Sequence, residues 1–244
     1  MSLVSRRGFL RSAGGLGFAV PALGTAYAAG IEPGLSLDIT RYHLTPPEWA
    51  EALSILHAPL GVFAVLGNHD LWHGALPTMP SDHGEAIRAA LRRTRIELLE
   101  NDAVPLLQGG QPFWLAGLAD QLAHRLDYDV FRGNDDLDGT LAKVRGDAPI
   151  VLLAHEPMIF SRVPARVSLT LCGHTHGGQV VLPFIGTPFA ERRFGRGHVY
   201  GHVVEDGRHM IISAGLGTSI VPVRFMRPPE IVEVTLGGPP LVVG

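Results

Sequence analysis

Three apolar stretches of this chain are each followed by histidine, and this pattern constrains the fold more than any other feature. The stretches cover residues 61–66, 150–154 and 167–171, and the histidines that follow them are His69, His155, His174 and His176. Short apolar runs of this kind are typical of buried strands. We expect the side chains at the strand ends to meet in space, because the packing of a core does not by itself require histidine at three such positions.

The segment from Cys172 to Gln179, with the sequence CGHTHGGQ, carries two of these histidines. A strand points alternate side chains to the same face, so His174 and His176 are predicted to aim at one point beyond the strand end. The glycines around them allow the backbone to turn tightly. Two converging imidazoles indicate a metal site. The alternative is one exposed and one core histidine, which would be the default for a lone His-x-His.

Composition excludes several classes of protein. The chain has 244 residues, of which 46% are hydrophobic and 18% charged, so we expect a globular chain with one sizeable core. A net charge of −3 does not favour binding to a nucleic acid, which is itself a polyanion. The single cysteine, Cys172, rules out an internal disulfide and a cysteine-rich zinc site. We interpret it as a small apolar side chain in a strand.

The amino terminus has the order of features of an export signal. Arg6 and Arg7 precede an apolar stretch at residues 13–22, and Ala26-Tyr27-Ala28 is a small-x-small cleavage site. We therefore predict that residues 1–28 are a twin-arginine-type signal and that the protein is exported, to the periplasm or to a membrane surface. The apolar stretch is short and glycine-rich for a spanning helix. The alternative is a basic, frayed terminus.

The rest of the chain, residues 29–244, is predicted to form one layered α/β domain with mixed sheets, because strands and helices alternate before a β-rich tail. Helices are expected at residues 45–57, after a capping box at Asp82 and Glu85, and around Leu137 to Val144. The predicted strands cover residues 61–66, 96–99, 104–107, 112–118, 150–154, 167–171, 180–182, 199–204, 210–214 and 231–236.

Asn68-His69-Asp70, His155 and the His174/His176 pair, in this order, resemble the motifs of the calcineurin-like metallophosphoesterases, and of their exported bacterial branch in particular. The resemblance extends over residues 50–236. It implies an α-β-β-α sandwich of two mixed sheets flanked by helices. It also implies hydrolysis of a phosphomonoester, a phosphodiester or a lipid-linked pyrophosphate at two divalent metal ions, which would be manganese, iron or zinc.

The resemblance assigns a role to each matching residue. His69 would face the phosphoryl group and assist departure of the leaving oxygen, and Asp70 would hold the His69 ring in the required tautomer. His176 would bind one metal, and the other residues would bind the second. The implied metal ligands are Asn68, His155, His174 and His176.

Two motifs of the family pattern do not occur in this sequence, namely Asp-x-His after a first strand and Gly-Asp-x-x-(Asp/Asn) after a second. Gly67 follows Gly30 by 37 positions, whereas two strand–crossover–strand units need about 30 residues each. Our hypothesis is an internal deletion near residues 47–50. We then expect no carboxylate at the histidine cluster, weak binding of a single metal, impaired activity, and unpaired sheet edges that hinder folding. A non-catalytic remnant or binding module is the alternative function, and a structural envelope protein is a third.

The resemblance also defines the expected partners. They are a small-molecule or lipid phosphoester and no nucleic acid; peripheral membrane association and the oligomeric state stay open. Arg192, Arg193 and Arg196 follow the paired histidines, and we interpret them as a solvated loop in preference to a phosphate clamp.

Overall fold

The computed structural model describes residues 53–72, 83–127, 130–195, 197–219 and 222–237. The predicted signal, the proposed deletion point and most of the helix expected at residues 45–57 lie outside these residues. No helix within them is long and apolar enough to cross a bilayer.

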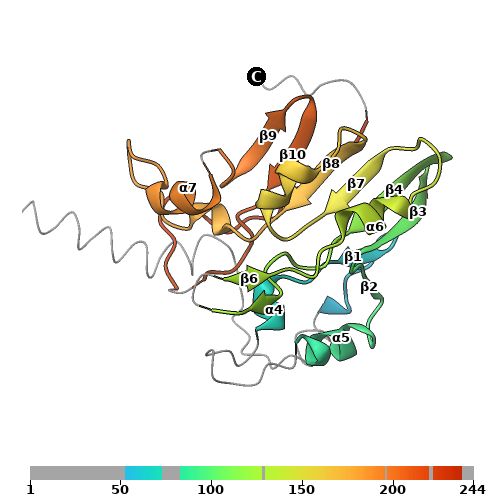
Figure 1. The fold of residues 1–244 in the computed structure, drawn as a ribbon, viewed down its shortest axis with the longest axis horizontal. Helices are drawn as coiled ribbons and strands as arrows, with labels where there is room; N and C mark the ends of the chain where they lie inside the picture. The colour runs from blue at the N-terminus through green and yellow to red at the C-terminus, as the bar shows by residue number, and fades with distance from the viewer. Residues whose placement is uncertain (1–52, 73–82, 128–129, 196, 220–221, 238–244) are drawn as a thin grey trace, which may run out of the picture.

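A six-stranded mixed sheet forms the centre of the structure, in the order β3-β4-β7-β8-β10-β9 (Figure 1). Its four inner strands are parallel, and β3 and β9 are antiparallel edge strands. The predicted strands 104–107, 112–118, 150–154, 167–171, 199–204 and 210–214 all lie in it. The strands are β3 (Asp102–Gln108), β4 (Gln111–Gly117), β7 (Ile150–Leu153), β8 (Val167–Cys172), β9 (Gly201–Glu205) and β10 (Arg208–Ile212).

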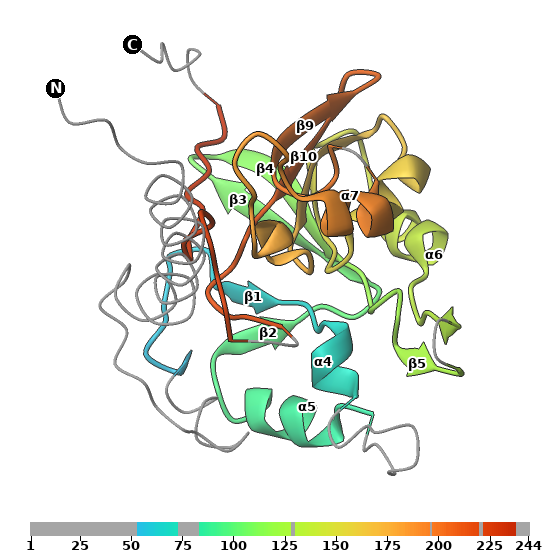
Figure 2. The same ribbon diagram turned by 90° about the vertical axis from the view of Figure 1, so that its left-hand side faces the viewer.

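A second, smaller sheet pairs β1 (Val62–Ala64) in parallel with β2 (Ile96–Leu98). The helices α4 (Asn68–Leu71) and α5 (Glu85–Leu91) accompany this pair (Figure 2). Helix α5 forms where predicted and buries Ile87, Ala90 and Leu91, although its N-cap is Gly84. A short hairpin, β5 (His124–Arg125) with β6 (Phe131–Arg132), lies outside both sheets.

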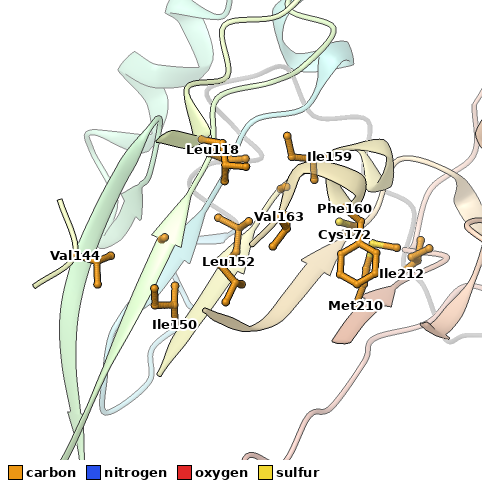
Figure 3. Close-up of a cluster of buried hydrophobic side chains, with 14 residues drawn as sticks. Leu118, Val144, Ile150, Leu152, Ile159, Phe160, Val163, Cys172, Met210 and Ile212 are labelled. Carbon is orange, nitrogen blue, oxygen red and sulfur yellow. The ribbon is translucent and has the colours of Figure 1, made fainter. Parts of the chain in front are cut away.

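The alternation of side chains along the strands separates the structure into four layers. In β7, Leu152 packs in a core with α6 (Leu137–Ala142) and the 3₁₀ helix η2 (Pro157–Arg162) (Figure 3). Its neighbours Val151 and Leu153 point the other way, into a core with Phe63 and Val65 of the β1 region. Val62 and Ala64 in turn face α4 and α5. The predicted α-β-β-α arrangement is therefore confirmed, with a mixed central sheet flanked by helices.

The core between the two sheets is the least filled. It contains three buried side chains, those of Leu99, Leu115 and Val151, surrounded by partly buried ones. A hollow of about 240 Å³ opens there between β1 and the ends of β7 and β8, and His155 lies in its wall. Within the described part of the chain, the two short strands β1 and β2 cover only part of this face of the six-stranded sheet.

Three expectations for the carboxyl-terminal part are wrong. Residues 180–182 form no strand and only make isolated bridges, of Val180 with Phe225 and of Leu182 with Gly186. Residues 231–236 form no strand. The segment with Arg192 and Arg193, interpreted as a loop, contains α7 (Pro188–Phe194), a helix that buries none of its residues. Because no apolar stripe faces the core, helical periodicity is weak in this segment. Pro188 in the first turn favours the helix that forms.

Candidate metal centre

Three predicted metal ligands meet beyond the ends of β1, β7 and β8. His155 Nε2 lies 3.2 Å from Asn68 Oδ1. The rings of His155 and His174 are 5.0 Å apart, edge to face at 80°. Asn68 is buried and opens α4 directly after the β1 region. The structure thus brings together side chains 87 positions apart, carried at the ends of strands in the two different sheets.

Gly67 is required by this close approach. A Cβ atom at position 67 would lie 2.6 Å from His155 Nε2 and Cε1. The glycine has φ −111°, a conformation open to any residue, so its function here is to leave room for the imidazole. The Gly-Asn-His-Asp motif therefore positions His155 as well as its own polar residues.

His174 and His176 are brought to the site by strained turns, not by strand alternation. Strand β8 ends at Cys172, and His174 and His176 adopt φ +67° and +51°. Left-handed conformations cost non-glycine residues free energy and persist where the surroundings enforce them. The prediction that alternate positions of one strand aim the two rings is therefore wrong in its mechanism.

The tautomer of His176 is set by the loop that follows β10. Its Nδ1 donates to the carbonyl oxygen of Gly217 at 3.1 Å, which leaves Nε2 without the proton and able to bind a metal. Arg224, fully buried, holds this loop in place. Its guanidinium donates to the carbonyl oxygens of His176, Ala214, Gly215, Gly217 and Arg227.

Burial keeps the clustered imidazoles neutral. It lowers the pKa of His155 to about 4 and that of His174 to about 3, and repulsion between neighbouring imidazoles adds to the effect. Burial also lowers the pKa of His176. A metal binds the neutral imidazole, so these side chains are in the ligand form at neutral pH without loss of a proton.

Glu156 is a site residue that the sequence interpretation missed. Its side chain is 0% exposed, and Oε1 lies 3.6 Å from His174 Nδ1. Ligand atoms of His155, Glu156 and His174 all lie within 4.8 Å of one another. The prediction that no carboxylate reaches the histidine cluster is therefore wrong. The signal in the sequence is that Glu156 directly follows His155.

A second buried carboxyl, that of Asp120, lies behind Glu156. Burial raises the pKa of Asp120 to about 6, and burial together with repulsion from Asp120 raises the pKa of Glu156 to about 9. Asp120 Oδ1 accepts a hydrogen bond from the Leu122 N–H at 2.7 Å. The two carboxyls share a hydrogen bond. Apart from that contact, Asp120 Oδ2 and Glu156 Oε1 have no hydrogen-bond partner among the described residues.

The predicted catalytic pair lies at the exposed rim. The ring of His69 is exposed, and its Nε2 lies 3.4 Å from Ser219 Oγ. Ser219 is held by its own N–H, which donates to Gln179 Oε1 at 2.8 Å. The Asp70 carboxylate accepts the N–H of Gly67 at 2.9 Å. The role of Asp70 in orienting His69 stays a prediction, and Ser219 is a contact of His69 that the sequence did not indicate.

Comparison with known proteins agrees with this arrangement. Residues 38–205 match the family model described as calcineurin-like phosphoesterase. An uncharacterized metallophosphoesterase of Aquifex aeolicus is 34% identical over 78% of this chain and 66% of that protein. The chain belongs to the calcineurin-like phosphoesterase family.

Two further relatives carry related names. The uncharacterized metallophosphoesterase YkuE of Bacillus subtilis is 33% identical over 74% of this chain and 58% of its own length. The phosphodiesterase YaeI of Escherichia coli is 29% identical over 77% of this chain and 63% of its own length. The chain thus spans less than two thirds of the length of these relatives.

The donor set of this calcineurin-like domain fits a divalent metal. Neutral imidazoles, an amide oxygen and a carboxyl oxygen are the mixed ligands that manganese, iron and zinc accept. Of these ligand atoms, Glu156 Oε1 would be stabilised most by a cation, because it has no hydrogen-bond partner beyond the neighbouring Asp120 carboxyl. The ligand atoms of His155, Glu156 and His174 lie close enough together to share one ion. Among the described residues, no other set of three or more histidine, cysteine or acidic side chains does so. His176 lies outside this group.

Proposed function

We propose that this protein is an exported metal-dependent phosphoesterase whose activity is reduced relative to complete members of the family. The observation that carries the proposal is the meeting of Asn68, His155 and His174 beside the exposed ring of His69. Family membership supports hydrolase chemistry, and the ligand set supports the requirement for a metal.

The residues at the site would have separate roles in hydrolysis. When bound, a divalent ion would offset the charge of the phosphoryl oxygens and lower the pKa of a coordinated water. Asn68, His155 and His174 would hold it. His69, from the solvent side, would donate a proton to the leaving oxygen, with Ser219 Oγ fixing the direction of Nε2.

The substrate class is proposed from two observations. One relative is named a phosphodiesterase, which favours a phosphodiester over a monoester. Helix α7 and the turn before it expose Phe184 (109%), Ile185 (64%) and Phe189 (85%), next to the cations Arg192 and Arg193.

This exposed surface lies close to the metal ligands, because the Phe194 ring at the end of α7 contacts His174 at 5.2 Å. Exposed aromatic side chains beside arginines fit an anionic lipid surface. We therefore propose a phosphodiester or a lipid-linked pyrophosphate as the substrate, with peripheral membrane association.

Reduced activity is proposed from the ligand count. The first two metal motifs of the family pattern are absent from the sequence, and His176 belongs to no group of three ligands among the described residues. The hollow in the core between the two sheets supports the hypothesis of an internal deletion near residues 47–50. These observations also favour the second candidate function, a non-catalytic remnant that binds a single metal.

Hydrolysis of a chromogenic phosphodiester by the purified chain, titrated with Mn²⁺, tests the proposal. We expect slow, metal-dependent turnover that falls at least about 10²-fold in His69→Ala, as for loss of a general acid. His209→Ala is the matched control, because His209 is exposed on β10 and pairs with His202 away from the site. Turnover that is absent at every metal concentration would favour the remnant.

Export is proposed from residues 1–28 alone. Replacement of both Arg6 and Arg7 by lysine is expected to leave the precursor in the cytoplasm. Cell fractionation measures this, and unchanged export would contradict it.

A further inference from the structure

The Glu156 carboxyl occupies a position that neither the fold nor the family pattern explains. It is fully buried, and its Oε2 accepts the N–H of Gln121 at 3.2 Å. The other oxygen, Oε1, faces His174. Apart from the hydrogen bond that the Glu156 and Asp120 carboxyls share, it has no hydrogen-bond partner among the described residues. A buried acid oxygen left in this way costs free energy unless a cation or a donor satisfies it.

The spacing at this oxygen is that of two ligands around one ion. With metal–ligand bonds of about 2.1 Å, ligand atoms lie about 3.0 Å apart in octahedral and about 3.4 Å apart in tetrahedral geometry. The His174 Nδ1 to Glu156 Oε1 distance is 3.6 Å, and the His155 Nε2 to Asn68 Oδ1 distance is 3.2 Å. A charge-assisted hydrogen bond is shorter, about 2.7–2.9 Å. The His174 Nδ1 to Glu156 Oε1 distance is therefore longer than a charge-assisted hydrogen bond. It is slightly longer than the separation of two ligand atoms around one tetrahedral ion.

The charges around the gap favour a cation. The two imidazoles are neutral, and the carboxyls of Glu156 and Asp120 repel each other when both are ionised. A divalent ion at Oε1 would offset the repulsion and allow Glu156 to ionise.

We propose that Glu156 is a metal ligand, binding one divalent cation through Oε1 together with His155 and His174. The carboxylate supplies the negative charge that the missing motifs would otherwise provide. This inference rests on the metal requirement of the proposed function. Binding of the ion can nevertheless be measured without turnover.

The competing role for Glu156 is indirect. A carboxylate that accepts the Nδ1–H of His174 would orient the ring without touching the ion. The two roles differ in what the ion experiences. A direct ligand changes the electronic spectrum of bound cobalt when it is replaced, whereas an orienting group changes mainly the affinity.

Titration of the full chain with Co²⁺, followed by visible absorption and calorimetry, separates the roles. We expect Glu156→Gln to weaken Co²⁺ binding at least about tenfold and to shift the absorption bands. His174→Ala should do both as well. The matched control is Glu205→Gln, which alters a second histidine–glutamate pair, His198 with Glu205 at 2.6 Å, outside the site. It should leave affinity and bands unchanged.

Unchanged bands in a folded Glu156→Gln protein, or an affinity loss below about tenfold, would overturn the proposal. If circular dichroism shows that this variant is unfolded, crystals of the unaltered protein soaked in Mn²⁺ decide the question by anomalous scattering. Manganese within bonding distance of Oε1 supports the proposal, and manganese bound by the histidines alone overturns it. Cobalt bound as proposed, with no hydrolysis of any phosphodiester, would refute the proposed function and leave this inference standing.

Discussion

Substitution of Gly67 by alanine should disable the metal centre without touching a ligand. The new Cβ would lie 2.6 Å from the His155 ring, whereas ordinary contact begins at about 3.4 Å, so the ring must retreat by about 0.8 Å. Metal–ligand distances tolerate about 0.2 Å. His155 can then no longer share an ion with His174. Because φ at position 67 is −111°, alanine adds no backbone strain and the effect is steric alone.

We expect Gly67→Ala to weaken binding of Zn²⁺ or Co²⁺ at least tenfold, which is about 1.4 kcal/mol, and to destabilise the metal-free chain by about 1–3 kcal/mol through overpacking. Calorimetric titration and urea unfolding measure the two effects. Gly173→Ala is the matched control, because a Cβ at this position next to His174 would meet nothing within 4 Å. Equal metal affinity in Gly67→Ala and the unaltered chain would refute the packing of His155 against Gly67.

Three other predictions test the surroundings of the site. Arg224→Met should lower the free energy of unfolding in urea by about 3 kcal/mol or more, because it removes a buried donor from several carbonyl oxygens; a loss below about 1 kcal/mol would contradict this. The metal-free chain should lose stability as pH rises from 7 to 9, by on the order of 2 kcal/mol, because the raised pKa of Glu156, about 9, means that the folded state keeps a proton that an unfolded glutamate has lost. Urea unfolding across this range should show a smaller decline in Asp120→Asn, which removes the repulsion from Asp120 and leaves burial, the larger cause of the raised pKa. Replacing Phe184 and Phe189 by serine should lower the affinity for phosphatidylglycerol vesicles, measured by co-sedimentation, at least tenfold. Unchanged affinity would argue against a lipid-facing α7.

The layers of the fold could be predicted because burial leaves a direct trace in the sequence. Strand β7 is buried on both faces and is apolar throughout, β8 is apolar except at Ser168 and Thr170, and α5 shows the spacing of its buried residues. Helix α7 could not be predicted in this way, because a helix that buries nothing has no apolar stripe. Residues 231–236 have the composition of a strand but pair with no neighbour, and pairing is a property of the whole sheet.

The site was predicted where its residues end strands and missed where they do not. His155 and Asn68 follow apolar runs, which marks both as residues at strand ends, and the packing of the two sheets against each other brings them together. Glu156 was missed because alternation places consecutive side chains on opposite sides, whereas the chain leaves the strand at this point and enters η2. Ser219 approaches His69 from a loop 150 positions away that only the tertiary fold determines. Whether a carboxylate serves the metal thus depends on the path of the backbone after β7, so the motif count alone underestimates the ligands available to this domain.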